Sequence, residues 1–139
     1  MGNVKILIAE DNRFNRRFYD ATISGNVFEK QFAENGLEAI KIYKDWQPEI
    51  ILLDLMMPVM NGQAVLKEIR QNKQDNATTI IISSSSSSRD DVVTCAKFGV
   101  QGYLVKPINP KEVNRTILRM HKEAHPDKAS EIISLMQYV

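Results

Sequence analysis

Short apolar runs of strand length alternate along this chain with longer segments in which apolar residues recur at helical spacing. The predicted strands, in chain order, are Val4–Ala9, Phe28–Ala33, Ile50–Leu53, Thr79–Ser83 and Gly102–Val105. The predicted helices run from Asn12 to about Ser24, over Leu37–Trp46, Gln63–Gln71 and Arg89–Phe98, and from Asn109 or Pro110 to about Lys122. This alternation of strands and helices predicts a parallel sheet joined by right-handed crossovers.

The polar residues within these runs indicate where each element lies. Ile50–Leu53 is the most hydrophobic run, so we predict that it is the central strand, with both faces covered. Phe28–Ala33 alternates apolar and polar residues, which is typical of an edge strand with one exposed face. The apolar side of the first helix is predicted to consist of Phe14, Phe18, Ala21 and Ile23.

Three of the predicted strands end on charged residues. Glu10 and Asp11 follow the first strand, Asp54 follows the third, and Lys106 follows the fifth. Because the carboxyl ends of parallel strands meet at one edge of the sheet, these side chains are expected to share a crevice. Three carboxylates that close together repel one another unless a cation neutralises them, and oxygen ligands suit Mg²⁺. The pattern therefore predicts a metal-dependent site that handles phosphoryl groups.

Composition and charge narrow the class of protein. The chain has 139 residues, 43% of them hydrophobic and 25% charged, which indicates one ordinary globular domain. Its formal charge of +1 offers no global attraction for nucleic acid or a membrane surface. No signal-peptide pattern or membrane-spanning apolar stretch is visible, and a single cysteine, Cys95, fits a reducing compartment. We therefore expect a cytoplasmic domain.

Four features in order along the chain resemble the receiver domains of two-component response regulators. They are the string KILIAEDN, the string IILLDLMMPVMNG, a hydroxyl residue ending the fourth strand, and the string GYLVKP. The resemblance covers about Val4 to Lys122 and implies a three-layer, doubly wound α/β fold, flavodoxin-like, with a five-stranded parallel sheet of strand order 2-1-3-4-5. It also implies a cis peptide at Lys106–Pro107. The string EDN with Asn15 and Arg16 resembles the receivers of hybrid histidine kinases and phosphorelays.

This resemblance implies a role for each residue at the predicted crevice. Asp54 matches the phosphoacceptor, which attacks the phosphorus of a phosphohistidine. Glu10, Asp11 and Asp54, with the main-chain carbonyl of Met56, match the ligands of Mg²⁺, for which Mn²⁺ can substitute. Lys106 matches the lysine that pairs with the carboxylates at rest and with a phosphoryl oxygen after transfer.

Further residues match the switch and the positions that tune the dephosphorylation rate. Ser84 matches the switch hydroxyl, and Tyr103 matches the aromatic residue that swings inward when the hydroxyl moves to the phosphoryl group. Met56 and Ser86 match the rate-tuning positions, and since methionine offers an attacking water no hydrogen bond, we expect modest self-hydrolysis. Glu10 stands where the family more commonly has Asp, and its extra methylene places a water between carboxylate and metal in this interpretation.

Two segments lie outside the regular pattern. Ser83–Ser88 is six consecutive serines, interpreted as a strand end plus a loop, with a flexible linker as the alternative. Residues 1–123 are predicted to form the receiver domain, and residues 124–139 a tail that is either a short helix or the start of a linker. A helix in this tail would run over Asp127–Tyr138, capped by Asp127.

The function implied is that of a signalling phosphoacceptor, not an enzyme with an external substrate, which catalyses its own phosphorylation and slow dephosphorylation. Its expected partners are a histidine kinase or histidine phosphotransfer protein and a downstream protein, without nucleic acid or membrane.

A haloacid-dehalogenase-like phosphatase requires a second Asp two residues after Asp54, where Met56 stands. A dinucleotide or flavin binder requires a Gly-rich first turn, which EDNRFN lacks. A pseudo-receiver that acts only as an interaction module stays open, as do the cognate kinase, the output and the oligomeric state.

Overall fold

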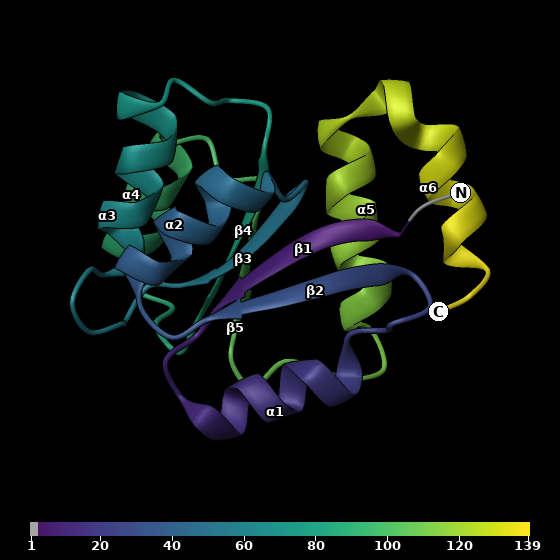
Figure 1. Ribbon diagram of the computed structural model, residues 1–139, viewed down its shortest axis with the longest axis horizontal. Coiled ribbons are helices and arrows are strands. Elements are labelled where there is room, and N and C mark those ends of the chain that lie inside the picture. Colours follow the sequence, from purple (N-terminus) through teal and green to yellow (C-terminus); the bar gives the residue numbers. More distant parts are fainter. Residues whose placement is uncertain (1–2) are drawn as a thin grey trace.

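The computed structural model describes residues 3–139, and in this range a five-stranded parallel sheet lies between two layers of helices (Figure 1). The strands are β1 (Val4–Ala9), β2 (Phe28–Ala33), β3 (Ile50–Asp54), β4 (Thr79–Ser84) and β5 (Gly102–Val105). Their order is β2-β1-β3-β4-β5 and every neighbouring pair is parallel. The predicted doubly wound fold and strand order are confirmed, with β3 at the centre of the sheet and β2 at its edge.

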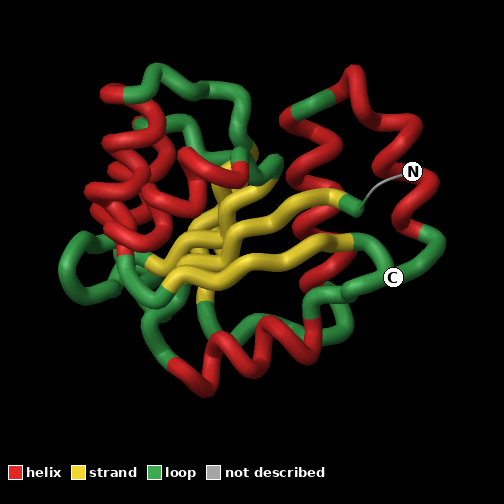
Figure 2. The backbone as a smooth tube through the Cα atoms, in the orientation of Figure 1, coloured by secondary structure: helices red, strands yellow, loops and turns green. Residues whose placement is uncertain are grey.

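Helices cover both faces of this sheet (Figure 2). They are α1 (Arg13–Thr22), α2 (Gly36–Trp46), α3 (Gly62–Lys67), α4 (Arg89–Lys97), α5 (Val113–Ala124) and α6 (Ala129–Met136). A π-helical turn, Glu68–Asn72, continues α3, and a 3-10 turn, Pro126–Lys128, precedes α6. Buried side chains of α1, α5 and α6 pack on one face, and those of α2, α3 and α4 pack on the other.

The apolar character of the three inner strands explains this sandwich. Side chains of a strand alternate between the two faces of a sheet, so a strand that is apolar throughout needs a cover on both. Ile6, Ile8, Ile50, Leu52 and Ile81 enter the core beside α1 and α5. Leu7, Ile51, Leu53, Ile80 and Ile82 enter the core beside α2, α3 and α4.

Polar caps begin the helices that leave the carboxyl edge of the sheet. Asn12, Asn35, Asn61 and Ser88 each accept a hydrogen bond from the backbone N–H three residues later. Such caps satisfy backbone donors that the first helical turn leaves without partners. Each cap lies in a loop that follows β1, β2, β3 or β4, so the four caps fix the loops at one edge of the sheet.

The inward side of α1 differs from the one predicted. Phe14 is 78% exposed and Ala21 is exposed, whereas Tyr19 is buried. Phe18 is half-buried and Ile23 is buried, as expected. The prediction placed the inward stripe about one residue out of phase, which on a helix is a rotation of about 100°.

Two predicted helix starts are also wrong in detail. The last long helix begins at Val113, because Asn109 opens a separate turn in which its backbone oxygen accepts hydrogen bonds from the N–H groups of Glu112 and Val113. In the tail, Asp127 belongs to the 3-10 turn, and Lys128 precedes α6 without a side-chain cap. Asp127 is therefore not the cap of this helix.

The tail folds back onto the core beside α5 (Figure 1). Ile132 and Leu135 of α6 are buried in the same cluster as Val4 and Val27, near the amino ends of the strands. Ile133, on the other side of α6, is 55% exposed. Of the two alternatives for the tail, a short helix or the start of a linker, the structure has a helix, and it contributes to the hydrophobic core. Across residues 3–139, the structure contains no helix long and apolar enough to cross a membrane.

Candidate functional site

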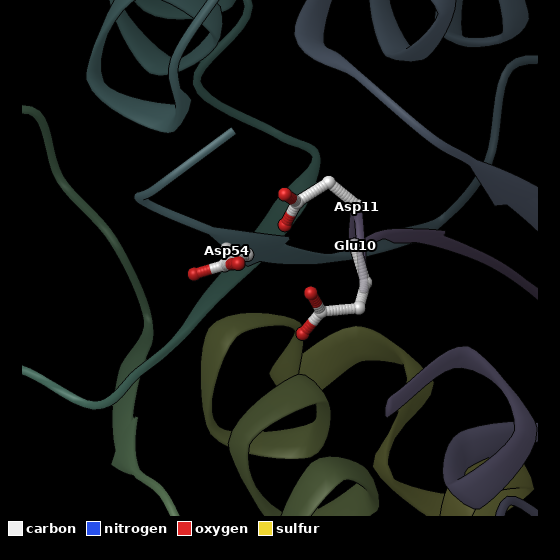
Figure 3. A group of neighbouring side chains, drawn as sticks. All are labelled: Glu10, Asp11 and Asp54. Carbon is white, nitrogen blue, oxygen red and sulfur yellow. The ribbon is translucent and has the colours of Figure 1, made fainter. Parts of the chain in front are cut away.

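Three carboxylates meet at the carboxyl edge of the sheet (Figure 3). Glu10 and Asp11 directly follow β1, and Asp54 is the last residue of β3. Because β1 and β3 are adjacent parallel strands in register, with Ala9 opposite Leu53, their ends bring the acids together. One carboxylate oxygen of each acid lies within 4.8 Å of those of the other two.

The ammonium group of Lys106 completes this cluster from the end of β5. Its Nζ lies 2.6 Å from Oε1 of Glu10 and 3.6 Å from Oδ2 of Asp54. Burial by itself lowers the pKa of Lys106, but the hydrogen bond to Glu10 and the charge of Asp54 raise it above its ordinary value. Lys106 is therefore charged at rest. The structure brings together the four residues whose positions at strand ends suggested a shared crevice.

Glu10 is the most tightly held of the three acids. Its side chain is buried, and Oε1 accepts hydrogen bonds from Lys106 Nζ and from Asn15 Nδ2 at 3.2 Å. Its other oxygen, Oε2, accepts one from the backbone N–H of Asn12 at 3.1 Å. The role of Asn15 was not predicted from the sequence, because Phe14 was placed on the inward side of this helix instead.

Asp11 lies at the open side of the cluster. Its side chain is exposed, but its backbone is held, because Arg16 Nη1 donates hydrogen bonds to the carbonyl oxygens of Glu10 and Asp11 at 3.0 and 2.7 Å. Arg16 also forms an ion pair with Glu34 at 3.2 Å. This clamp fixes the loop between β1 and α1 and leaves the Asp11 carboxylate accessible to a ligand from solvent.

Asp54 is buried like Glu10 but accepts fewer hydrogen bonds. Burial, followed by the negative charge of Glu10, raises the pKa of Asp54 to about 6, although Lys106 and a backbone hydrogen bond lower it. That bond is donated by the N–H of Met56 to Oδ1 at 3.2 Å. At neutral pH the carboxyl group is largely ionised, and its raised pKa makes it more basic than an exposed carboxylate. A basic carboxylate facing a cation is suited to nucleophilic attack.

The predicted switch residues lie beside the cluster and are linked through one backbone segment. Ser84 is buried, and its Oγ accepts a hydrogen bond from the N–H of Ser86 at 3.1 Å. The hydroxyl of Tyr103 donates to the carbonyl oxygen of Ser86 at 2.7 Å. Ser86 Oγ donates to Asp91 at 2.6 Å, and Met56 is 72% exposed. Ser84 and Tyr103 are thus both hydrogen-bonded to the backbone of Ser86 and not to the acids.

The donor set at the cluster fits a hard divalent cation. It consists of carboxylate oxygens, without histidine or cysteine, which favours Mg²⁺ or Mn²⁺ over zinc. Three acids against one lysine leave a net negative charge that a dication offsets. Asp11 and Asp54 have fewer protein hydrogen bonds than Glu10, so they offer the more available oxygens.

Comparisons with known proteins give a consistent picture. A family model described as response regulator receiver domain matches residues 6–118. A probable transcriptional regulator, ycf27, of Porphyridium aerugineum is 33% identical over 130 residues, which are 94% of this chain and 52% of that protein. The regulatory protein AtoC of Escherichia coli is 30% identical over 115 residues, 83% of this chain and 24% of that protein. The chain spans about half the length, or less, of these curated relatives.

Solved structures show the same likeness. The signal receiver domain of a putative Luxo repressor protein from Vibrio parahaemolyticus superposes with a TM-score of 0.82 at 28% identity, covering 94% of this chain and 98% of that one. The chemotaxis protein CheY4 of Vibrio cholerae gives a TM-score of 0.78 at 28% identity, covering 86% and 99%.

Proposed function

The chain belongs to the family of response regulator receiver domains, a class of signalling proteins, and we propose that Asp54 is its phosphoacceptor and takes the phosphoryl group of a phosphohistidine. The observation that carries this proposal is the meeting of Glu10, Asp11 and Asp54 within 4.8 Å, with Lys106 paired to two of them. Asp54 is the member of this cluster that has neither the full hydrogen bonding of Glu10 nor the exposure of Asp11.

The transfer is a displacement at phosphorus. A carboxylate oxygen of Asp54 attacks the phosphorus atom and forms an acyl phosphate, while the phosphorus–nitrogen bond breaks and its electron pair stays on the imidazole, which takes up a proton from water. Lys106 is within reach of the oxygen that carries the new group. Its ammonium can pair with a phosphoryl oxygen by a charge-assisted hydrogen bond.

A divalent cation completes the charge balance of this reaction. Glu10, Asp11 and Asp54 would hold Mg²⁺, or Mn²⁺ in its place, with the carbonyl of Met56. When bound, the ion offsets the negative charge of the carboxylates and of the incoming phosphoryl group. Because Glu10 already accepts hydrogen bonds from Lys106, Asn15 and the backbone of Asn12, its contact with the ion would run through water.

Phosphorylation then changes the shape of a surface. The phosphoryl dianion attracts the Ser84 hydroxyl, which gives up the N–H of Ser86. Since Tyr103 donates to the carbonyl of Ser86, movement of the Ser86 backbone would free the ring to swing inward. The readout is an altered affinity for a downstream protein.

The rate-tuning positions support a slow loss of the phosphoryl group. Met56 is exposed and has no side-chain hydrogen-bonding group, and the hydroxyl of Ser86 is engaged with Asp91. Neither is set to orient an attacking water, so modest self-hydrolysis stays our expectation.

The partners follow from this chemistry. We infer a histidine kinase or a histidine phosphotransfer protein as donor, and a protein as receiver of the signal. One relative is named a probable transcriptional regulator and another a DNA-binding response regulator, and this chain matches only 52% and 56% of their lengths. That this domain itself does not contact nucleic acid remains our prediction. Cys95 is buried and unpaired, which is compatible with the cytoplasmic location we expect.

The proposed function is tested with a small-molecule phosphodonor. Incubation with acetyl phosphate and Mg²⁺ should add one phosphoryl group to the intact mass, and chelation of the metal should abolish the addition. A pseudo-receiver, the second candidate from the sequence, would gain no phosphoryl group under either condition.

A further inference from the structure

A pair of buried hydroxyl groups lies beneath the acidic cluster. Tyr19 of α1 and Ser83 of β4 are 2% and 1% exposed, and their hydroxyl oxygens lie 2.5 Å apart. Burial raises the pKa of Tyr19, so its hydroxyl keeps its proton at neutral pH. This hydrogen bond, which we call the Tyr19–Ser83 bond, joins residues that are 64 positions apart in the chain.

Ser83 occupies a particular place in the sheet. It lies opposite Asp54 of β3 and opposite Leu104 of β5, and it directly precedes Ser84. Because successive side chains of a strand point to opposite faces, Ser83 faces α1 while Ser84 faces the side of α3 and α4. One peptide group joins the two serines, so a displacement of Ser84 also displaces Ser83.

The α1 side of the Tyr19–Ser83 bond is tied to the loop that carries Glu10 and Asp11. Asn12 caps α1, and Arg16 ties the helix to the backbone of Glu10 and Asp11. Ser83, in contrast, stands at the end of a strand whose next residues form a loop of serines. The Tyr19–Ser83 bond therefore connects α1, which these hydrogen bonds tie to the loop after β1, to the strand end that carries the proposed switch hydroxyl.

We propose that Tyr19 is a positioning residue of the switch, whose hydrogen bond to Ser83 holds the end of β4 in its resting arrangement and weakens when Ser84 is drawn toward a phosphoryl group on Asp54. This rests on the proposed function, since it takes Ser84 as the switch hydroxyl. A contact made in one state and lost in the other shifts the equilibrium between them by its own free energy. Removing this contact therefore favours the activated state.

The predicted effect has a sign and a size. Beryllofluoride with Mg²⁺ imitates a phosphoryl group on a carboxylate, and we expect Tyr19→Phe to bind it about two- to tenfold more tightly than wild type, the range that one net hydrogen bond allows. Ser83→Ala should tighten binding by a similar factor. In the double variant the two effects should not add, because both substitutions remove the same bond.

Tyr43→Phe is the matched control. The Tyr43 hydroxyl also donates a hydrogen bond to a side chain, to Asp75 at 2.6 Å, but from α2 and away from the end of β4. Tyr43→Phe and Tyr19→Phe should both lower the free energy of unfolding, and only the second should change the affinity for beryllofluoride. This separates a positioning role from a general loss of stability.

The experiment titrates wild type, the three variants of the Tyr19–Ser83 bond and Tyr43→Phe with beryllofluoride and Mg²⁺. Binding is monitored through the amide chemical shift of Tyr103, and the stability of each protein is measured by urea unfolding. Unchanged or weaker binding by Tyr19→Phe and Ser83→Ala, or additive effects in the double variant, would overturn this inference while wild-type binding leaves the proposed function standing. Failure of the wild type to bind would overturn both.

Discussion

Lys106 forms its short contact with Glu10, at 2.6 Å, whereas its distance to Asp54 is 3.6 Å. The resting ammonium is thus held mainly by an acid that does not receive the phosphoryl group in our proposal. Asp54 keeps a counter-charge nearby without being locked into a close ion pair. This arrangement leaves Asp54 available to a phosphodonor and keeps Lys106 ready to pair with the product.

The negative charges around Asp54 should lower the free energy of unfolding when no metal is bound, and substitution of Asp54 should reveal this. The pKa of Asp54 is raised to about 6, whereas an unfolded aspartate has a pKa of about 3.9. The protonated carboxyl therefore contributes stability that is fully present below the unfolded pKa and is lost as the pH rises through about 6. The side chain of Asp54→Asn is uncharged at every pH, so it avoids the burial of a charge and the repulsion by Glu10. Without metal, this variant should therefore be more stable than wild type by roughly 1–3 kcal/mol at neutral pH.

Urea unfolding in a chelating buffer measures this difference. The gap between Asp54→Asn and wild type should shrink toward about pH 4, where both side chains are neutral. A variant that is less stable than wild type at neutral pH would show that Asp54 is not in a repulsive environment.

Metal binding should depend on the exposed acid. Asp11→Asn removes one of the two more available carboxylates and should weaken Mg²⁺ binding about tenfold or more, since few protein ligands hold this ion. Asp45→Asn, an exposed acid of α2, is the control and should bind as wild type does. Calorimetric titration gives both constants, and an unchanged affinity of Asp11→Asn would place the ion elsewhere.

The parts of the site that could be predicted are those that depend on strand direction alone. Once the apolar runs are assigned to parallel strands, the residues after them share an edge, and this located Glu10, Asp11, Asp54 and Lys106. Hydrogen bonds that depend on the phase of a helix were not accessible in the same way. Phe14 suggested the wrong inward side of α1, so the inward positions of Asn15 and Tyr19 were missed.

The switch assignment can be tested among neighbouring serines. Ser84→Ala should still accept a phosphoryl group but should lose most of the chemical-shift changes around Tyr103, because the hydroxyl that moves is gone. Ser85→Ala, whose side chain is exposed, should retain them. Shift changes that persist in full in Ser84→Ala would mean that another residue, or none, acts as the switch.

The tail offers a test of its place in the core. Ile132 is 2% exposed and its neighbour Ile133 is 55% exposed. Ile132→Ala should lower the free energy of unfolding by about 2–4 kcal/mol, because it leaves a cavity in the core cluster that includes Val4 and Val27. Ile133→Ala should cost less than about 1 kcal/mol. Equal effects in urea unfolding would mean that α6 does not pack on the core in solution.

The surface that α6 covers could not be predicted from the sequence. Apolar residues at helical spacing predicted a helix there, and one is present, but the pattern could not say which surface it covers. Ile132 and Leu135 join a core cluster that includes Val4 and Val27, which are distant from the tail in sequence. The helix start was also missed, since Asp127 is a good cap by residue type but lies within a preceding 3-10 turn.

Intact mass spectrometry after treatment with acetyl phosphate and Mg²⁺ measures whether Asp54 accepts a phosphoryl group. Wild type should gain one phosphoryl group, and Asp54→Asn, which retains the shape of the side chain without its nucleophilic carboxylate, should gain none. Full phosphorylation of Asp54→Asn, or none in a folded wild type that binds Mg²⁺, would mean that Asp54 is not the phosphoacceptor.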